Sequence, residues 1–279
     1  MSRWTIRPFR THRDYEACIA LQEATWGTGF SELVPMALMM VSQRLGGVAA
    51  GAYDEDGALA GFVIGMTGLE NGVPVHWSDM LAVRPDQRGS GLAIHLKSYQ
   101  RDAVMALGIR HMYWSFDPLE SRNAYINLAK LGIVVREYVE NMYGQTDSPL
   151  HRGMTTDRFV ARWQLDAPRV ERRLAGDESP PAIGELAEAP RVIECASGSS
   201  SAWPEPEARE TPRANRVLAA IPSNIQALKS ESPELAARWR EATRSVLRSY
   251  LSNGYEVCEL IRGARVSRYL LRRIEETPS

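Results

Sequence analysis

The chain has 279 residues, enough for one large domain or two modest ones with a sizeable buried core. Hydrophobic residues make up 44%, charged residues 24%, and the formal net charge is -1, so no overall field draws the chain to nucleic acid or an anionic membrane. The N-terminal residues lack the apolar run of a signal peptide, and no stretch approaches the roughly 18 apolar residues of a membrane span. We therefore expect a cytoplasmic protein with no nucleic-acid or membrane partner.

The three cysteines, Cys18, Cys195 and Cys258, lie far apart in the sequence and show neither a CxxC motif nor a Cys/His spacing. Such spacing supports neither a disulfide framework nor a zinc site. The sequence therefore predicts reduced thiols and no metal.

The first part of the chain predicts the order strand, helix, helix, strand, strand, strand. Hydrophobic periodicity, glycines and prolines define these elements. Two β-type runs flank Asp54-Glu55-Asp56-Gly57, an acidic, glycine-terminated loop that is typical of a hairpin. The predicted ranges are 5–9, 14–26, 32–44, 48–53, 58–66 and 75–83.

The order after residue 90 is helix, strand, helix, strand, strand. The predicted ranges are 91–107, 109–116, 121–131, 133–139 and 158–165, with Ser121 as the N-cap of the second helix and Gly132 closing it. Residues 167–215 are rich in Pro, Glu, Ala and Ser and predict a loop or linker with one candidate strand at 191–194. Residues 216–274 then predict a β-α-β-β lobe. We expect three parts: a domain at 1–166, a connecting segment at 167–215, and a C-terminal lobe at 216–279 packed on the first domain.

A glycine-rich loop, Arg88-Gly89-Ser90-Gly91, separates a predicted central strand from an amphipathic helix. Glycines let the backbone turn sharply and let a ligand approach it closely. The first amides of a helix have no intrahelical partner, and with the helix dipole they attract an anion. Arg88 adds charge-assisted hydrogen bonds, so the loop predicts a diphosphate site.

Two familiar nucleotide loops fit this segment poorly. A Rossmann loop has the pattern GxGxxG with an acidic residue about 20 positions later, whereas R-G-S-G-L-A contains only two glycines. A Walker A loop has Lys-Ser/Thr after its glycines, and this pair is absent.

The chain instead resembles the GNAT acyltransferases. Arg88-x-x-Gly91-x-Ala93 matches their R/Q-x-x-G-x-G/A signature, Val83-x-Pro85 matches their usual strand exit, and the element order over residues 5–165 fits their fold. The resemblance implies an α+β fold with a mixed, mostly antiparallel sheet flanked by helices. It also implies acetyl-CoA or another acyl-CoA as cofactor, with succinyl-CoA as one option. The implied cofactor-binding residues are Leu81, Ala82, Val83, Arg88, Gly89, Ser90, Gly91, Leu92, Ala93, Asn123 and Asn127.

Acylation of an amine needs a proton acceptor for the amine and often a proton donor for the thiolate. Asp79 lies in an otherwise apolar strand beside the predicted pantetheine-pairing segment, so it is the candidate base; His76 is a weaker candidate. Many GNAT enzymes carry a Tyr donor four residues before the glycine that closes the next helix, but Leu128 occupies that position here. The alternatives for the donor are Tyr125, Tyr138 and Tyr143, and each also fits a packing role.

A second group of residues comprises Trp114-Ser115-Phe116-Asp117-Pro118-Leu119, Asn123-Ala124, Asn127, Lys130-Leu131-Gly132, Tyr138, Asn141, Tyr143-Gly144 and Thr156-Asp157-Arg158. It resembles a GNAT subgroup with the pattern W-x-F-D-P-L…N-A…N…K-L-G…Y-G…T-D-R, which is linked with N-acylation, including N-succinylation, of amino acids. In physical terms Asp117 and Asp157 could bind an ammonium group, and Arg158 could bind a carboxylate. Alternatively, Asp117-Pro118 caps a turn and Asp157-Arg158 is a surface pair. The candidate residues are therefore Asp79, Tyr143 and Asp117 for catalysis and Trp114, Asp157 and Arg158 for substrate binding.

The predicted helix of the C-terminal lobe carries Arg238, Arg240, Arg244 and Arg248, which we expect to form a solvated face paired with acids. The leading hypothesis for function is acyl transfer from acyl-CoA to a small-molecule primary amine by direct attack in a ternary complex, because no cysteine lies at the loop or the adjacent strand. Two alternatives remain: a non-catalytic acyl-CoA sensor, which the missing Tyr favours, and a scaffold that acts through the C-terminal lobe. A homodimer is a further possibility.

Overall fold

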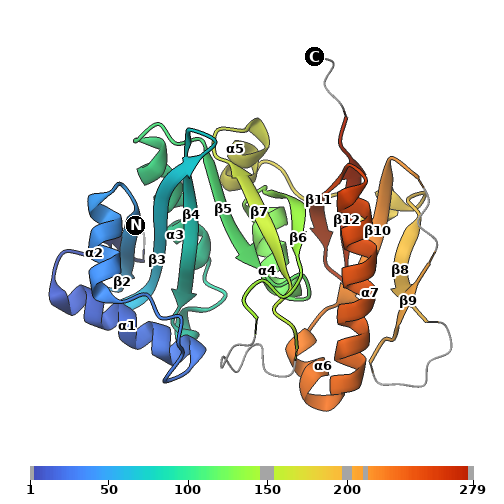
Figure 1. Cartoon of the computed structure of the whole chain (residues 1–279), viewed down its shortest axis with the longest axis horizontal. Coiled ribbons are helices and arrows are strands. Elements are labelled where there is room, and N and C mark those ends of the chain that lie inside the picture. The colour runs from blue at the N-terminus through green and yellow to red at the C-terminus, as the bar shows by residue number, and fades with distance from the viewer. Residues whose placement is uncertain (1–2, 145–153, 197–202, 210–212, 276–279) are drawn as a thin grey trace. The chain divides into compact units, whose positions relative to one another are not determined.

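The computed structural model describes residues 3–144, 154–196, 203–209 and 213–275. Their contacts divide the chain into two compact units (Figure 1). The first unit contains the residues up to 114 together with 163–167, and the second contains most of the remainder, including the whole C-terminal part. Strands β5 and β7 each contribute to both units. The domain boundary expected at residue 166 stays a prediction.

The first unit is a mixed sheet in the order β1-β2-β3-β4-β5, antiparallel except for the parallel pair β4 and β5. Phe62 and Ile64 of β3 pack into the core made with α1 and α2. On the other face, a Cβ at Gly61 would lie only 3.1 Å from Leu96 of α3, so glycine lets α3 pack closely on the sheet. The elements are β1 (Thr5–Pro8), α1 (His12–Trp26), α2 (Met36–Arg44), β2 (Val48–Tyr53), β3 (Leu59–Glu70), β4 (Val73–Val83), the 3-10 turn η1 (Pro85–Gln87), α3 (Leu92–Met105) and β5 (His111–Phe116).

The start of α2 differs from the sequence prediction. The helix begins at Met36 rather than near residue 32, because Pro35 occupies the N-cap with an extended backbone (φ -72°, ψ 156°). A proline also disfavours helical geometry in the residue before it. The strands and helices otherwise follow the predicted order from β1 to β7, which confirms the mixed, mostly antiparallel α+β class.

The second unit has the strand order β7-β6-β11-β12-β10-β8-β9. Helix α7 packs against β6, β10 and β11 and buries Trp239, Val246 and Leu247. The elements are α4 (Ser121–Tyr125), the π-helix η2 (Ile126–Lys130), β6 (Val134–Val139), β7 (Arg158–Gln164), α5 (Pro168–Ala175), the 3-10 turn η3 (Ile183–Leu186), β8 (Arg191–Cys195), β9 (Pro206–Ala208), β10 (Arg216–Pro222), α6 (Ile225–Glu231), α7 (Pro233–Ser252), β11 (Tyr255–Ile261) and β12 (Val266–Arg273).

Three features of this unit differ from the sequence prediction. The candidate strand at 191–194 is present as β8, but the segment 167–215 also contains α5 and β9, which were not predicted. Helix α6 was missed, although the Asn224 side chain caps it by accepting the Ala227 N–H at 3.1 Å. Ser121 is not the N-cap of α4: Glu120 holds that position, and the Ser121 hydroxyl donates to the Ser267 hydroxyl instead.

No helix within the described ranges combines the length and the apolar character needed to cross a bilayer.

Candidate functional site

The glycine-rich loop leaves β4 at Val83 and enters α3 at Leu92. The turn η1 comes first, and then Gly89 (φ 85°) and Gly91 (φ 91°) both take left-handed backbone conformations. Residues with a Cβ adopt these angles at a cost, so the two glycines let the chain reverse before the helix begins.

The amide groups at this turn point to a binding site for an anion. Among the described residues, the N–H groups of Gly89, Gly91, Leu92 and Ala93 have no hydrogen-bond acceptor, and the first such bond of the helix runs from the Ile94 N–H to the Gly91 carbonyl at 2.9 Å. The surface of the loop from residue 88 to 90 is exposed, so the start of the helix is open to solvent. Unpaired amides at the positive end of a 14-residue helix attract an anion.

Two arginines flank this loop, and they differ in their partners. Arg84 contacts Asp86 at 2.7 Å and Asp54 at 3.0 Å, and these carboxylates hold it beside the η1 turn. Arg88 is exposed and forms no ion pair with the described residues, so its guanidinium is available to a ligand. The loop therefore offers one uncommitted positive charge next to the unpaired amides.

One edge of β4 is open beside the loop. Pairing with β5 covers only Val75, His76 and Trp77, whereas pairing with β3 continues to Val83. The residues from 78 to 83 thus have a strand on one side only within the described chain. Backbone groups on this edge can pair with an extended ligand, as an added strand would.

Asp79 occupies a bulge in β4. Met80 pairs with Ile64 and Ser78 with Gly65, which leaves Asp79 as the extra residue between them. A bulge turns a side chain away from the regular alternation. The Asp79 carboxyl is exposed, yet the surrounding protein atoms partly desolvate it and Glu32 adds a negative charge, so its pKa is raised. A raised pKa suits a carboxylate that accepts a proton from an ammonium group.

His76 faces the interior rather than the loop. It is fully buried, and its Nε2 lies 3.0 Å from Gln100 Nε2 while its Nδ1 lies 3.1 Å from the Thr67 hydroxyl. Since the Gln100 amide donates to Nε2, the proton of the neutral ring is on Nδ1 and is donated to Thr67. Burial, with a contribution from Lys97, lowers the pKa of His76 to about 3. This residue is a structural histidine.

Trp114 lies in the same buried region. Lys97 Nζ is 3.6 Å from the centre of its ring, and Trp163 meets the ring edge to face at 5.7 Å. Trp114 is 7% exposed, so its contacts are internal, and its assignment to the substrate stays a prediction.

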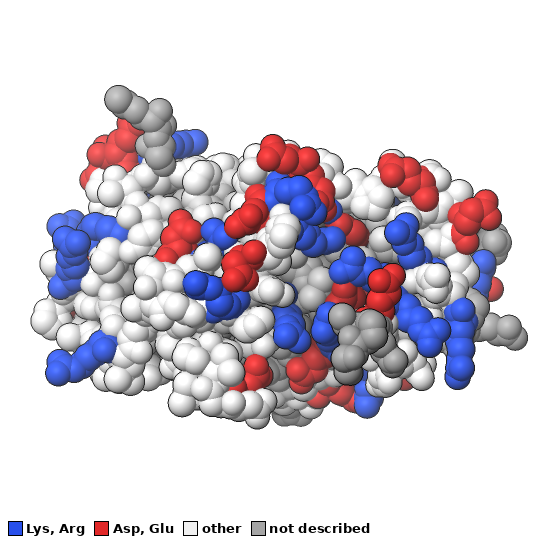
Figure 2. All heavy atoms as spheres, turned by 90° about the horizontal axis from the view of Figure 1, so that it is seen from above, with Lys and Arg blue, Asp and Glu red and all other residues white. Residues whose placement is uncertain are grey.

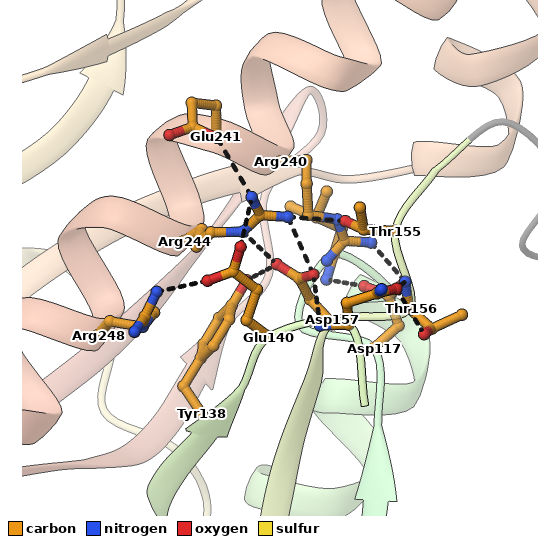
Figure 3. A network of polar contacts seen from close by, with 12 residues as sticks. Asp117, Tyr138, Glu140, Thr155, Thr156, Asp157, Arg240, Glu241, Arg244 and Arg248 are labelled. Carbon is orange, nitrogen blue, oxygen red and sulfur yellow. Dashed lines mark hydrogen bonds and ion pairs between the residues drawn. The ribbon is translucent and has the colours of Figure 1, made fainter. Parts of the chain in front are cut away.

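The second unit holds two further candidates, Asp117 and Asp157, in a polar network with arginines of α7 (Figure 3). Asp157 is fully buried and accepts hydrogen bonds from Tyr138 at 2.6 Å, from the Asn141 N–H at 3.2 Å, and from Arg244 Nε and Nη2 at 2.8 and 3.1 Å. Burial opposes ionisation of Asp157, but the bonds from Arg244 and Tyr138 outweigh it and lower its pKa to about 2. An ammonium group would have to compete with Arg244 for this carboxylate.

Asp117 is held by both its turn and α7. One oxygen accepts the Leu119 N–H at 2.8 Å, which confirms the turn-cap interpretation, and the other accepts from Arg240 Nη2 at 2.6 Å. The alternative that Asp157 and Arg158 form a surface pair is wrong, because they are 0% and 8% exposed.

The basic stretch of α7 is paired with acids, as predicted, but it is not uniformly a solvated face. Arg238 pairs with Glu205 and Arg248 with Glu140 at the surface. Arg240 is 4% exposed and reaches inward to Asp117.

The remaining candidates of this unit lie near its surface or in its helix. The Tyr143 hydroxyl is 2.7 Å from the Ser115 hydroxyl, and Arg158 lies 5.3 Å from the centre of the Tyr143 ring. Asn127 donates to Asn123 at 3.4 Å, which confirms that the two share a face of their helix. The nearby Leu128 is fully buried.

The structure thus gathers the candidates into two groups. Asp79, Trp114 and the residues at 81–83 and 88–93 belong to the first unit, and Asp117, Asn123, Asn127, Tyr143, Asp157 and Arg158 belong to the second. Their assignment to one site stays a prediction. Sequence reasoning missed Arg240 and Arg244 as partners of Asp117 and Asp157; their spacing of four on a helix was the available signal.

No protein-family model and no curated protein matches the sequence. Solved structures similar to this chain include an N-acetyltransferase from Staphylococcus aureus Mu50, with 18% identity over 59% of this chain and 100% of that chain and a TM-score of 0.47. They also include the ribosomal-protein-S18-alanine N-acetyltransferase from Escherichia coli, with 17% identity over 59% of this chain and 95% of that chain and a TM-score of 0.46. A third is a chain of the NatC complex bound to Gag peptide and CoA, with 14% identity over 58% of this chain and 99% of that chain and a TM-score of 0.47.

Proposed function

We propose that this protein transfers an acyl group, acetyl or succinyl, from acyl-CoA to a primary amine of an amino acid or another small molecule. The observation that supports the proposal most strongly is the open start of α3, where the amides of Gly89, Gly91, Leu92 and Ala93 are unpaired beside Arg88. The oxygen atoms of a diphosphate can accept hydrogen bonds from these four backbone amides and from one guanidinium at the same time.

The residues around the loop fit the rest of the cofactor. The open edge of β4 at Leu81, Ala82 and Val83 offers backbone groups to the amides of a pantetheine arm. Acyl-CoA supplies an activated thioester carbonyl when it is bound. Asn123 and Asn127 are the proposed further contacts, and Ser90 completes the loop.

Asp79 is the proposed base. Its raised pKa and its exposed position in the bulge of β4 let it take the proton from the amine, directly or through a water molecule. Tyr143 is the proposed proton donor to the leaving thiolate, and Asp117 and Asp157 are proposed to orient the amine, with Arg158 on a carboxylate of the ligand. No cysteine lies in β4 or the loop, so direct attack by the amine is the proposed route.

A second function is supported by Leu128. The position at which many GNAT enzymes carry a Tyr is held here by a fully buried leucine. A protein that binds acyl-CoA as a sensor, without turnover, is consistent with this feature.

Release of free thiol tests the proposal. Acetyl-CoA and succinyl-CoA are each incubated with a panel of L- and D-amino acids, polyamines and short peptides, with wild-type protein and with Asp79→Asn. We expect amine-dependent thiol release by the wild type and a large loss in the variant. Tight binding of acyl-CoA without thiol release for any amine would favour the sensor, and absence of binding would contradict both.

A further inference from the structure

The turn that carries Tyr143, residues 141–144, is held by the segment that precedes β7. Asn141 begins this turn with a left-handed backbone (φ 47°), a conformation that persists only where surrounding contacts hold it. The Gly144 N–H closes the turn on the Asn141 carbonyl at 3.1 Å. Thr156 supports the turn from outside: its hydroxyl accepts the Tyr143 N–H at 3.0 Å, and its own N–H donates to the Asn141 side chain at 3.3 Å. The backbone of Tyr143 therefore depends on contacts beyond its own turn.

One arginine of α7 contacts the chain on both sides of this turn. Arg244 Nη1 lies 3.1 Å from Glu140 Oε1, just before the turn, and Arg244 Nη2 donates to the Thr155 hydroxyl at 2.8 Å. Its Nε and Nη2 also donate to the two oxygens of Asp157 at 2.8 and 3.1 Å, and Asp157 accepts the Asn141 N–H at 3.2 Å. Figure 3 shows Glu140, Thr155 and Asp157 around the Arg244 guanidinium. The guanidinium thus joins the residue before the turn to the residues that support it.

The contacts of Arg244 lie largely away from solvent. The Asp157 side chain is 0% exposed and the Arg244 side chain is 16% exposed. Removing the partner of a buried charge costs more than breaking a surface pair, so loss of the guanidinium would disturb Asp157 and the backbone amide that it binds. A guanidinium offers five donors in a fixed fork, whereas the ammonium of a lysine carries its three donors on one atom. The arrangement therefore suits an arginine better than another cation.

The Tyr143 side chain is 38% exposed, so its turn, rather than burial of its ring, determines where its hydroxyl lies beside Ser115. We propose that Arg244 is a positioning residue for Tyr143 in the acyl transfer. Through this arginine the C-terminal helix α7 fixes the place of the proton donor, and all the residues of this chain of contacts belong to the second unit. The inference rests on the proposed function and adds to it a residue that acts through Tyr143 rather than on the ligand.

A double-mutant cycle in the full chain tests this inference. Thiol release from acetyl-CoA is measured, with the amine that the wild type uses best, for Arg244→Gln, Tyr143→Phe and the double variant. We expect each single variant to lower kcat by roughly tenfold or more while the KM for acetyl-CoA stays within about twofold, and we expect the double variant to match Tyr143→Phe. Losses that multiply in the double variant would overturn the inference, because Arg244 would then act independently of Tyr143.

Two further variants separate positioning from a loss of the fold. Arg244→Lys keeps a cation beside Asp157 but not the guanidinium fork, so we expect it to fold and to lower kcat less than Arg244→Gln does. The matched control is Arg238→Gln on the same helix, which removes a surface pair with Glu205 and should have wild-type activity. Equal losses in Arg238→Gln and Arg244→Gln would contradict a specific role for Arg244. Where Arg244→Gln does not fold, Arg244→Lys takes its place in the cycle.

Hydrogen exchange of backbone amides separates this inference from the proposed function. The Asn141 and Tyr143 amides each donate a hydrogen bond that holds the turn, so we expect Arg244→Gln to speed their exchange by roughly tenfold or more and the control variant to leave it unchanged. Unchanged exchange in folded Arg244→Gln would overturn the positioning role, whether or not the protein transfers acyl groups. Absence of thiol release by the wild type with every amine would instead contradict the proposed function, and the exchange rates would still decide whether Arg244 holds the turn.

Discussion

The buried His76 should make the protein less stable in mild acid, because the folded chain keeps the ring neutral. The native ring stays neutral until the pH approaches its lowered pKa of about 3, whereas a histidine in the unfolded chain takes a proton at about pH 6.5. The unfolded state therefore binds more protons between these values, and the stability present above about pH 6.5 is lost as the pH falls towards 3. One proton corresponds to about 1.36 kcal/mol per pH unit, and protonation of the unfolded chain is half complete at pH 6.5, so the loss from His76 is about 2.7 kcal/mol between pH 7.5 and pH 4.5.

The assay compares urea denaturation of the wild type and of His76→Gln from pH 7.5 to pH 4.5. A glutamine can accept from Gln100 and donate to Thr67, as the neutral ring does, but it does not titrate. The other histidines are the same in both proteins, so the difference between the two free energies of unfolding isolates His76. We expect this difference to change by about 2.7 kcal/mol in favour of the variant as the pH falls from 7.5 to 4.5. A difference that does not vary with pH would refute the reasoning.

Three further predictions concern the candidate site. Gly91→Trp should abolish acetyl-CoA binding, because an indole there would cover the amides and a Cβ strains the backbone at φ 91°. The strain is confined to the turn, so we expect the circular dichroism spectrum to stay close to that of the wild type, and retained affinity in a folded variant would contradict the prediction. Asp79→Asn should lower turnover more than acetyl-CoA affinity, and a pH–rate profile identical to that of the wild type would exclude Asp79 as the base. Asp157→Asn should lower the free energy of unfolding by roughly 3–5 kcal/mol in urea denaturation, because it breaks the buried pair with Arg244; a loss below about 1 kcal/mol would count against that pair.

The fold was predictable where the pattern along the chain is local. The order of elements from β1 to β7 follows from hydrophobic periodicity and from glycines and prolines at the turns. The errors have local causes too: Pro35 delays α2, and Ser121 binds Ser267 rather than the start of its own helix. Within residues 167–215 the candidate strand at 191–194 corresponds to β8, whereas the composition hides α5 and β9, because their apolar residues are few and their stability comes from packing on the rest of the second unit.

The candidate site, like the fold, was predictable only where its residues are contiguous in the sequence. The glycine-rich loop is a continuous segment, so its backbone turn and its free amides could be expected from residues 88–93 alone. The bulge at Asp79 depends on the register between β3 and β4, which the sequence does not specify. The partners of Asp117 and Asp157 are Arg240 and Arg244, which are 123 and 87 positions away, so only the folded chain brings them together.

The most direct test of the central claim is to record amide chemical shifts by NMR while CoA is added. We expect the amide signals of Gly89, Gly91, Leu92 and Ala93 to move most, and we expect Arg88→Ala to weaken the binding that moves them. If CoA binds without changing the chemical shifts of these four amides, or if no CoA binds at all, the assignment of a diphosphate site to the start of α3 is wrong.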